Sequence, residues 1–275
     1  MTSVKSVALI GLVALPIALT AGCSSNSRRA ERAYIERPVE VLYNQAAREM
    51  DQRDYDAAIV LFNEVERQHP YSEWARRSTL MSAFAAYQSR KYDEAISTAQ
   101  RYVALNPGSE NAPYAYHLIA TSYFEQITDV GRDQRTTELA RGALDEIMRR
   151  YPTSEYARDA QLKMDMVNDQ LAGKEMEIGR WYLRQNQHLP AINRFRTVVT
   201  GYDTTTHSPE ALYRLVESYL SIGLRGEAQA AAAVLGYNHP ETNWYQDAYR
   251  LMVREGLDPN DIPEERRRGL LSRLF

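Results

Sequence analysis

The sequence predicts an all-α fold, a superhelical solenoid of five helix–turn–helix repeats. From Glu40 onward, strand-like alternation is almost absent, and charged residues interleave with Ala, Leu and Tyr as they do in amphipathic helices. The motif Tyr-Asp-x-Ala-Ile starts at Tyr55 and again at Tyr92, 37 residues later. Pro70 and Pro107 follow the two copies, also 37 residues apart. A fixed period of this size is typical of stacked helical repeats.

The first segment, residues 1–22, has the pattern of a signal peptide. Lys5 supplies a positive charge, and the uncharged apolar run behind it is too short for a membrane-spanning helix. The residues LTAGC at 19–23 resemble the lipobox of bacterial lipoproteins. That resemblance implies cleavage before Cys23 and lipidation of its sulfur, and Ser24 implies sorting to the outer membrane. The alternative is a soluble secreted protein with an incidental thiol.

Three further segments follow the signal peptide. Residues 23–37 are polar and charged without an apolar period, so we expect a lipidated flexible tether. Residues 38–253 hold the repeats, with repeats 1 and 2 as an N-terminal half and repeats 3 to 5 as a C-terminal half. Residues 254–275 form a basic tail that contains RRRGLLSRLF, which suits either a membrane or partner contact or a frayed helix.

Each repeat resembles the tetratricopeptide (TPR) unit, in which small residues sit where two helices cross closely and a proline ends the second helix. The small positions of the second helices are Ala58, Ala95, Ala140, Ala191 and Ala228. The matching positions of the first helices are Ala46, Ala83, Ala120, Gly179 and Val216. The closing positions are Pro70, Pro107, Pro152, Asp203 and Pro240.

The spacing between repeats is uneven, with intervals of 37, 45, 51 and 37 residues between the small positions of the second helices. Inside repeat 3, TDVGRDQRT (128–136) predicts a long polar loop. Before repeat 4, apolar residues from Tyr156 to Leu171 lie at helical spacing, and Gly173 is expected to end this added helix. Each proline connector carries a Ser or Thr that we expect to cap the next helix: Ser72, Ser109, Ser154 and Thr242.

Composition argues against several functions. The net charge of −3 gives no general attraction to nucleic acid. One cysteine excludes an internal disulfide framework and a cysteine-based zinc site, and the five histidines are scattered. The sequence has no nucleophile elbow, phosphate loop or HExxH motif. We therefore expect a non-enzymatic protein without cofactor or metal.

The first helices of a helical solenoid line its concave face, where ligands usually bind. In repeats 1 and 2 that face would be apolar and aromatic, which suits an extended peptide with aromatic side chains. Packing between the two repeats explains the same residues equally well. The residues are Tyr43, Ala47 and Met50 in repeat 1 and Leu80, Phe84 and Tyr87 in repeat 2.

Taken together, the lipobox, tether, five TPR units, repeat-3 loop and added helix resemble the BamD family, lipoproteins of the outer-membrane β-barrel assembly (BAM) machine. The resemblance covers about residues 38–250, most specifically DYDAAIVLFNEVERQHPYSEWA, LNPGSENAPYAYHL and AINRFRTVV. It implies a lipid-anchored subunit on the periplasmic face of the outer membrane. Such a subunit binds a POTRA domain of BamA, works with the other BAM lipoproteins, and assists recognition, folding and insertion of unfolded outer-membrane proteins.

The resemblance also implies roles for individual residues. Arg194, with Asn193 beside it, matches the charged contact of the family with BamA. Arg101 aligns with a functional arginine in the substrate-receiving half, and His69 stands there where the family often has tyrosine. The loop residues Arg132 and Asp133 match a family loop.

Two other functions stay open. One is a periplasmic TPR adaptor that coordinates cell-wall synthesis with envelope constriction. The other, more distant, is an enzyme that acts on envelope substrates through a surface carboxylate. A pull-down from solubilised envelopes separates the adaptor from the BAM subunit.

Overall fold

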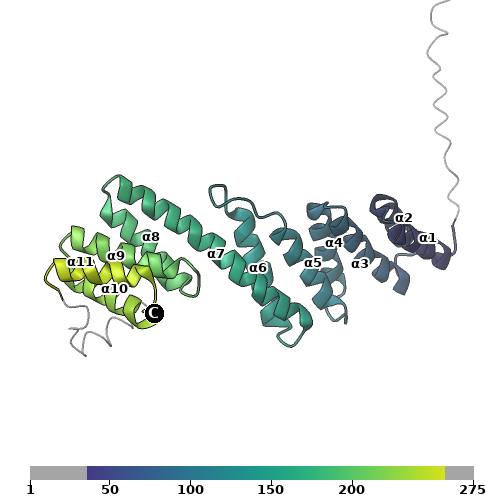
Figure 1. Cartoon of the computed structure of the whole chain (residues 1–275). Coiled ribbons are helices and arrows are strands. Elements are labelled where there is room, and N and C mark those ends of the chain that lie inside the picture. The colour runs from purple at the N-terminus through teal and green to yellow at the C-terminus, as the bar shows by residue number, and fades with distance from the viewer. Residues whose placement is uncertain (1–35, 258–275) are drawn as a thin grey trace, which may run out of the picture. The chain divides into compact units, whose positions relative to one another are not determined.

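The computed structural model describes residues 36–257, and this part of the chain forms eleven α-helices and no strand (Figure 1). The all-α prediction is confirmed. The helices are α1 (Val39–Asp51), α2 (Tyr55–Gln68), α3 (Glu73–Gln88), α4 (Tyr92–Leu105), α5 (Ala112–Phe124), α6 (Arg135–Arg150), α7 (Glu155–Arg184), α8 (His188–Gly201), α9 (Ser208–Ser221), α10 (Arg225–Asn238) and α11 (Asn243–Arg254).

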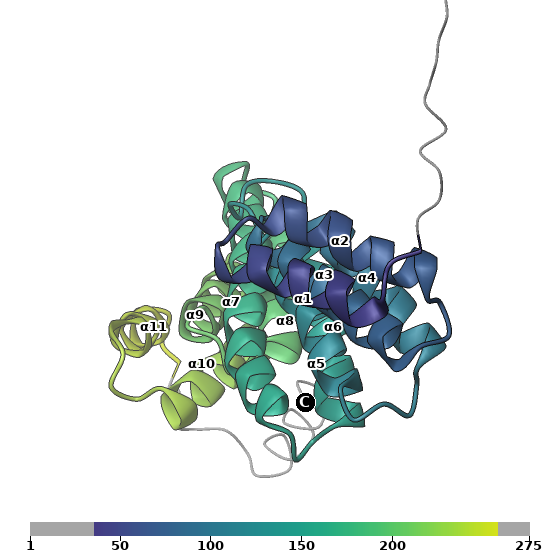
Figure 2. The ribbon, with the colours of Figure 1, turned by 90° about the vertical axis from the view of Figure 1, so that its right-hand side faces the viewer.

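Every helix packs against the helix before it and the helix after it in the chain. Contacts also join alternate helices, α1 with α3, α3 with α5, α5 with α7 and α9 with α11. Figure 2 shows this at the α1 end, where α3 lies behind α1. Helices α1, α3, α5 and α7 therefore form one row, and α9 with α11 forms another. The five repeats are α1–α2, α3–α4, α5–α6, the second half of α7 with α8, and α9–α10.

The small positions of the repeats lie where the helices cross, and all ten are buried. Gly179 is the tightest of them, because a Cβ built there would lie 2.5 Å from the ring of Phe195. Phe195 is itself fully buried between α7 and its neighbours. The predicted pattern of small and large residues is thus the packing pattern of the core.

The second helices end where the closing residues predict. Helices α2, α4, α6 and α10 each stop two residues before the proline, since the residue before a proline is disfavoured in the helical region. Helix α8 stops in the same way at Tyr202, with φ −143° and ψ 38°, although Asp203 replaces the proline. Tyr202 packs against the clusters on both sides of it, so tertiary packing maintains the same ending here.

Three of the four predicted helix caps are present. Ser72, Ser154 and Thr242 accept hydrogen bonds from backbone N–H groups in the first turns of α3, α7 and α11, at 3.0, 3.2 and 3.3 Å. These bonds satisfy donors that have no partner within the helix.

The fourth prediction, that Ser109 caps the next helix, is wrong. Helix α5 begins at Ala112 after Asn111, and the Ser109 hydroxyl instead pairs with the Tyr102 hydroxyl at 2.7 Å. Pro113 lies in the first turn of α5, where its missing N–H costs nothing, and this fixes the later start.

The expectation that Gly173 ends the added helix is also wrong. Helix α7 runs without a break for 30 residues and contains both the added segment and the first helix of repeat 4. A glycine inside a helix costs only about 1 kcal/mol, which packing overcomes. A Cβ at position 173 would lie 3.1 Å from Nε2 of His207 and 3.6 Å from Val130.

Two loops from different repeats meet on the middle of α7. The predicted polar loop lies between α5 and α6, and its Thr128 and Gly131 carbonyls accept bonds from Gln170 (2.8 Å) and Lys174 (3.2 Å). The connector between α8 and α9 is held by Asp169, which accepts from the Thr206 N–H at 3.0 Å and its hydroxyl at 2.6 Å. The centre of α7 therefore fixes repeat 3 against repeats 4 and 5.

The predicted signal peptide, Cys23, most of the tether and most of the basic tail lie outside the described residues. Within residues 36–257, no helix combines the length and the apolar character needed to cross a membrane.

Candidate functional site: two surfaces of the repeat stack

Of the concave-face residues predicted to bind an extended peptide, some lie in the core and others reach the surface. Leu80 is 8% exposed and packs in a core cluster with side chains of α4 and α5. Phe84 and Tyr87, from the same helix, are half-buried at the edge of that cluster. Of the three residues of repeat 2, Phe84 and Tyr87 are therefore the ones that reach the surface.

An aromatic row continues from these residues onto the next first helices. The ring centroids of Phe84 and Tyr114 of α5 are 6.4 Å apart. The ring centroid of Tyr156 of α7 lies 5.8 Å from that of Tyr114 and 5.0 Å from that of His117. Burial raises the pKa of Tyr114 from 10.0 to about 12, so its hydroxyl keeps its proton into strongly alkaline solution. The sequence interpretation missed the α5 and α7 members, although the spacing of Tyr114 and His117 places them on one helix face.

A hollow of about 320 Å³ lies beside this row, between the end of α3, helix α5 and the first turns of α7. Asp159 accepts from Nζ of Lys163 at 2.6 and 2.7 Å and lies 3.6 Å from Nδ1 of His117. Burial lowers the pKa of His117, so its imidazole is neutral at pH 7. The residues around the hollow are Tyr87, His117, Thr121, Glu125, Glu155, Tyr156, Asp159 and Lys163.

Arg101 and His69 lie on second helices, apart from the aromatic row of the first helices. Arg101 of α4 forms an ion pair with Glu66 of α2, and Glu66 also accepts from the Thr79 hydroxyl at 3.3 Å. His69 ends α2, and its carbonyl accepts from the Ser72 hydroxyl at 2.8 Å. Arg101 thus connects repeats 1 and 2.

Arg194 lies on α8 and reaches across to α7. Its Nη1 atom is 3.2 Å from Oε2 of Glu175, and the Arg194 side chain is 42% exposed while that of Glu175 is 21% exposed. The neighbouring Asn193 is exposed. The pair leaves part of the guanidinium open to a second acceptor.

Tyr202 connects this ion pair to a hollow of about 700 Å³. Burial raises the pKa of Tyr202; Arg141, whose guanidinium lies 5.5 Å from the ring, opposes the rise, and Glu175 adds to it. In the hollow, the Oδ1 atom of Asn168 is buried and has no hydrogen-bond partner within residues 36–257. We call this hollow, with Tyr202, Glu175 and Arg194, the α6–α8 surface. Its hollow is bounded by Glu138, Arg141, Gly142, Asp145, Met148, Met164, Asn168, Leu171 and Tyr202.

The predicted loop residues Arg132 and Asp133 are exposed. The Arg132 N–H donates to the Asp129 carbonyl at 3.0 Å, and Asp133 accepts from the Arg135 N–H at 3.1 Å where α6 begins. Because the loop is attached to α7, both side chains are presented from a fixed position.

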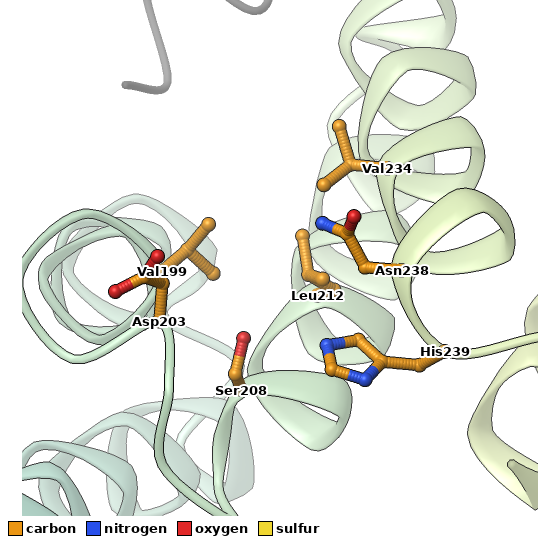
Figure 3. A pocket seen from close by; sticks show the side chains of 7 residues that line it. All are labelled: Val199, Asp203, Ser208, Leu212, Val234, Asn238 and His239. Atoms are coloured by element: carbon orange, nitrogen blue, oxygen red, sulfur yellow. The ribbon is translucent and has the colours of Figure 1, made fainter.

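A third hollow, of about 290 Å³, lies among α8, α9 and α10 (Figure 3). Asp203 follows α8, Ser208 begins α9, and His239 follows α10, with apolar side chains between them. No hydrogen bond joins these three polar residues to one another within the described part of the chain, so they do not form a connected proton relay there.

Among residues 36–257, no three His, Cys, Asp or Glu side chains come together as a metal site would require.

Comparison with known proteins gives one consistent family. The model of the YfiO family, described as outer membrane lipoprotein, matches residues 35–235. Outer membrane protein assembly factor BamD of Caulobacter vibrioides is 55% identical over 245 residues, which cover 89% of this chain and 80% of the relative. The BamD protein of Rickettsia prowazekii is 42% identical, over 84% of this chain and 91% of the relative.

Among solved structures, a TPR protein of Thermus thermophilus, TTC0263, aligns over 78% of this chain and 98% of its own, with 19% identity and a TM-score of 0.37. A similarity at this level adds nothing to the fold argument, which rests on the helix order and the buried small positions.

Proposed function

We propose that this chain, which belongs to the YfiO (BamD) family of outer membrane lipoproteins, is a non-enzymatic subunit of the BAM complex that docks on BamA. The BamD relatives are named as outer membrane protein assembly factors, and a role in that assembly follows from membership of the family. In this proposal Cys23 carries the lipid anchor, and the repeats lie on the periplasmic face of the outer membrane beside other BAM lipoproteins.

The observation that carries the docking proposal is the composition of the α6–α8 surface. It combines the partly exposed guanidinium of Arg194, a hollow of mixed polar and apolar lining that includes Met148, Met164 and Leu171, and the buried acceptor of Asn168. A buried acceptor without a partner is costly, and a donor from a docked protein would satisfy it. Apolar anchors surrounded by charges are typical of protein interfaces. We propose that a POTRA domain of BamA occupies this surface, with Arg194 and Asn193 at its edge.

The experiment must separate the intramolecular role of Arg194 from contact with BamA. We expect Arg194→Glu to weaken binding to BamA about tenfold or more, because it reverses the charge offered to the partner. The double variant Arg194→Glu with Glu175→Arg restores an ion pair between α7 and α8 and should still bind BamA weakly. Affinity is measured with purified BamA periplasmic domains, and circular dichroism checks the helical content.

Arg196→Glu is the matched control, since Arg196 is exposed on α8 two positions away, on a different face. It should leave BamA affinity unchanged. If the double charge swap binds BamA as well as the unmodified chain does, Arg194 acts only within the fold and the docking site must be placed elsewhere.

The substrate role is proposed for the aromatic row, which begins on α3 in the N-terminal half and continues onto α5 and the start of α7. The aromatic row from Phe84 and Tyr87 to Tyr114 and Tyr156 lies along the first helices, where unfolded outer-membrane proteins with aromatic side chains would stack. We include Arg101 and His69 in this half as supports of the α2–α4 packing.

A further inference from the structure

We propose that the hollow between α3, α5 and α7 is a subsite for a cationic side chain, arginine or lysine, of an extended polypeptide. The inference rests on the proposed function, because it specifies one feature of the substrate that the aromatic row receives. Two features of the hollow support it: its aromatic walls, and an excess of negative charge carried by exposed carboxylates.

The walls of the hollow are aromatic and come from three helices. Tyr87 ends α3, His117 lies in the middle of α5 and Tyr156 lies in the first turn of α7. His117 and Tyr156 have ring centroids 5.0 Å apart, so they form one continuous side of the hollow. A cation over an aromatic face is stabilised by the negative face of the ring, most strongly where water is partly excluded.

The charge of the lining favours a cation. Three carboxylates, Glu125, Glu155 and Asp159, face a single ammonium, that of Lys163. Asp159 holds that ammonium at 2.6 and 2.7 Å. With His117 neutral, the two remaining carboxylates leave the hollow with an excess of negative charge. Lys163 also lies 5.7 Å from the ring of Phe124, so the same region already pairs one cation with an aromatic ring.

The effect of the carboxylates on Tyr87 indicates that they act on one shared space. The pKa of Tyr87 is raised first by burial and then by Glu125, with a further contribution from Asp159. Glu125 follows the end of α5 and Asp159 lies on α7, so negative charge from two helices acts on a hydroxyl carried by a third. A guanidinium or ammonium placed there would be attracted by all of them.

The carboxylates that would receive the cation are accessible. Glu125 and Glu155 are exposed, and neither forms an ion pair with Lys, Arg or His within the described residues. The volume of about 320 Å³ corresponds to ~10 water molecules, which suits one long side chain. The neighbouring Phe84 and Tyr114 place aromatic contacts directly beside it. The geometry therefore fits an aromatic polypeptide segment that carries a positive residue.

The test compares two fluorescein-labelled peptides of ten residues with alternating aromatic and polar side chains. One has a central arginine and the other a central glutamine, and each is titrated with the mature lipidated chain in detergent. We expect the arginine peptide to bind about tenfold more tightly at low salt, and the difference to shrink at high salt. Fluorescence anisotropy measures both affinities.

The double variant Glu125→Gln with Glu155→Gln should bind both peptides equally, with the affinity that the unmodified chain has for the glutamine peptide. Glu110→Gln with Glu241→Gln is the matched control, because it removes the same charge from two exposed connector residues and should keep the preference for arginine. A preference that survives the first double variant, or equal binding of both peptides by the unmodified chain, overturns the subsite while leaving the substrate role intact. If neither peptide binds, the substrate role itself fails.

Discussion

At the scale of single residues, two helical glycines differ in how much space surrounds them, so one tests core packing and the other tests helix propensity. Gly179 touches the Phe195 ring so closely that a methyl group would overlap it, at 2.5 Å. Gly142 lies in α6, and nothing is within 4 Å of the place where its Cβ would be. The same substitution at the two positions should therefore have opposite effects on stability.

Gly179→Ala should lower the free energy of unfolding by about 1–3 kcal/mol, because α7 and α8 must move apart to admit the methyl group. Gly142→Ala should raise it by up to about 1 kcal/mol, because alanine favours the helix and fills open space. Thermal unfolding of the two variants measures both changes. A stabilised Gly179→Ala variant would mean that the close contact with Phe195 is not present in solution.

Tyr114 gives a prediction about alkaline pH. Burial raises its pKa from 10.0 to about 12 in the folded chain, so between these values the folded chain keeps a proton that the unfolded chain releases. The free energy of unfolding should therefore fall as pH rises from 10 to about 12. Tyr114→Phe should reduce that fall, as measured by urea unfolding at pH 8 and pH 11. The fully exposed Tyr71, replaced by Phe, is the control and should leave the pH dependence unchanged.

At the scale of elements, α7 differs most from the simple repeat. It is twice the length of most other helices of the chain, and loops from two different repeats are hydrogen-bonded to its centre. The helix is continuous across the boundary between repeats 3 and 4, so the two repeats share one rigid element. The α6–α8 surface includes side chains from both ends of that boundary, so its geometry depends on α7 remaining intact.

Asp169→Ala should loosen the connector between α8 and α9, because Thr206 loses two hydrogen bonds of on the order of 1 kcal/mol each. Hydrogen exchange at residues 203–207 should become faster, while α2 and α4 keep their protection. Asp165→Ala is the control on the same helix, since within residues 36–257 its carboxylate accepts a hydrogen bond only from the nearby Gln161, at 3.3 Å. Unchanged exchange at 203–207 would show that Asp169 does not hold the connector.

At the scale of the whole molecule, the repeat stack separates two proposed tasks. The aromatic row lies on the first helices of repeats 2 and 3 and the start of α7, and the α6–α8 surface follows it further along the chain. In our proposal, substrate contacts therefore begin on α3 in the N-terminal half and extend to the start of α7, and the BamA contact lies further along, in the C-terminal half. The third hollow, beside α10, takes no part in either proposal.

The sequence by itself determined the features that repeat or that depend on near neighbours. It predicted the small residues at the helix crossings, the helix ends before proline and three of the four caps. These features depend on steric fit, proline ring geometry and capping, which act within a few residues. Ser109 was misjudged because Pro113, four residues later, sets the start of α5. Gly173 was misjudged because packing on α7, beside His207 and Val130, outweighs the small cost of a glycine in a helix.

Only the tertiary structure decided which distant residues share a surface. Tyr87, His117 and Tyr156 come from three helices, and nothing in their local sequence indicates that they surround one hollow with Glu125. Arg194 was predicted from a resemblance, but its pairing with Glu175, which also acts on Tyr202, depends on how α7 and α8 cross. Local propensity fixes where a helix begins and ends, whereas a binding surface depends on the angles at which many helices pack.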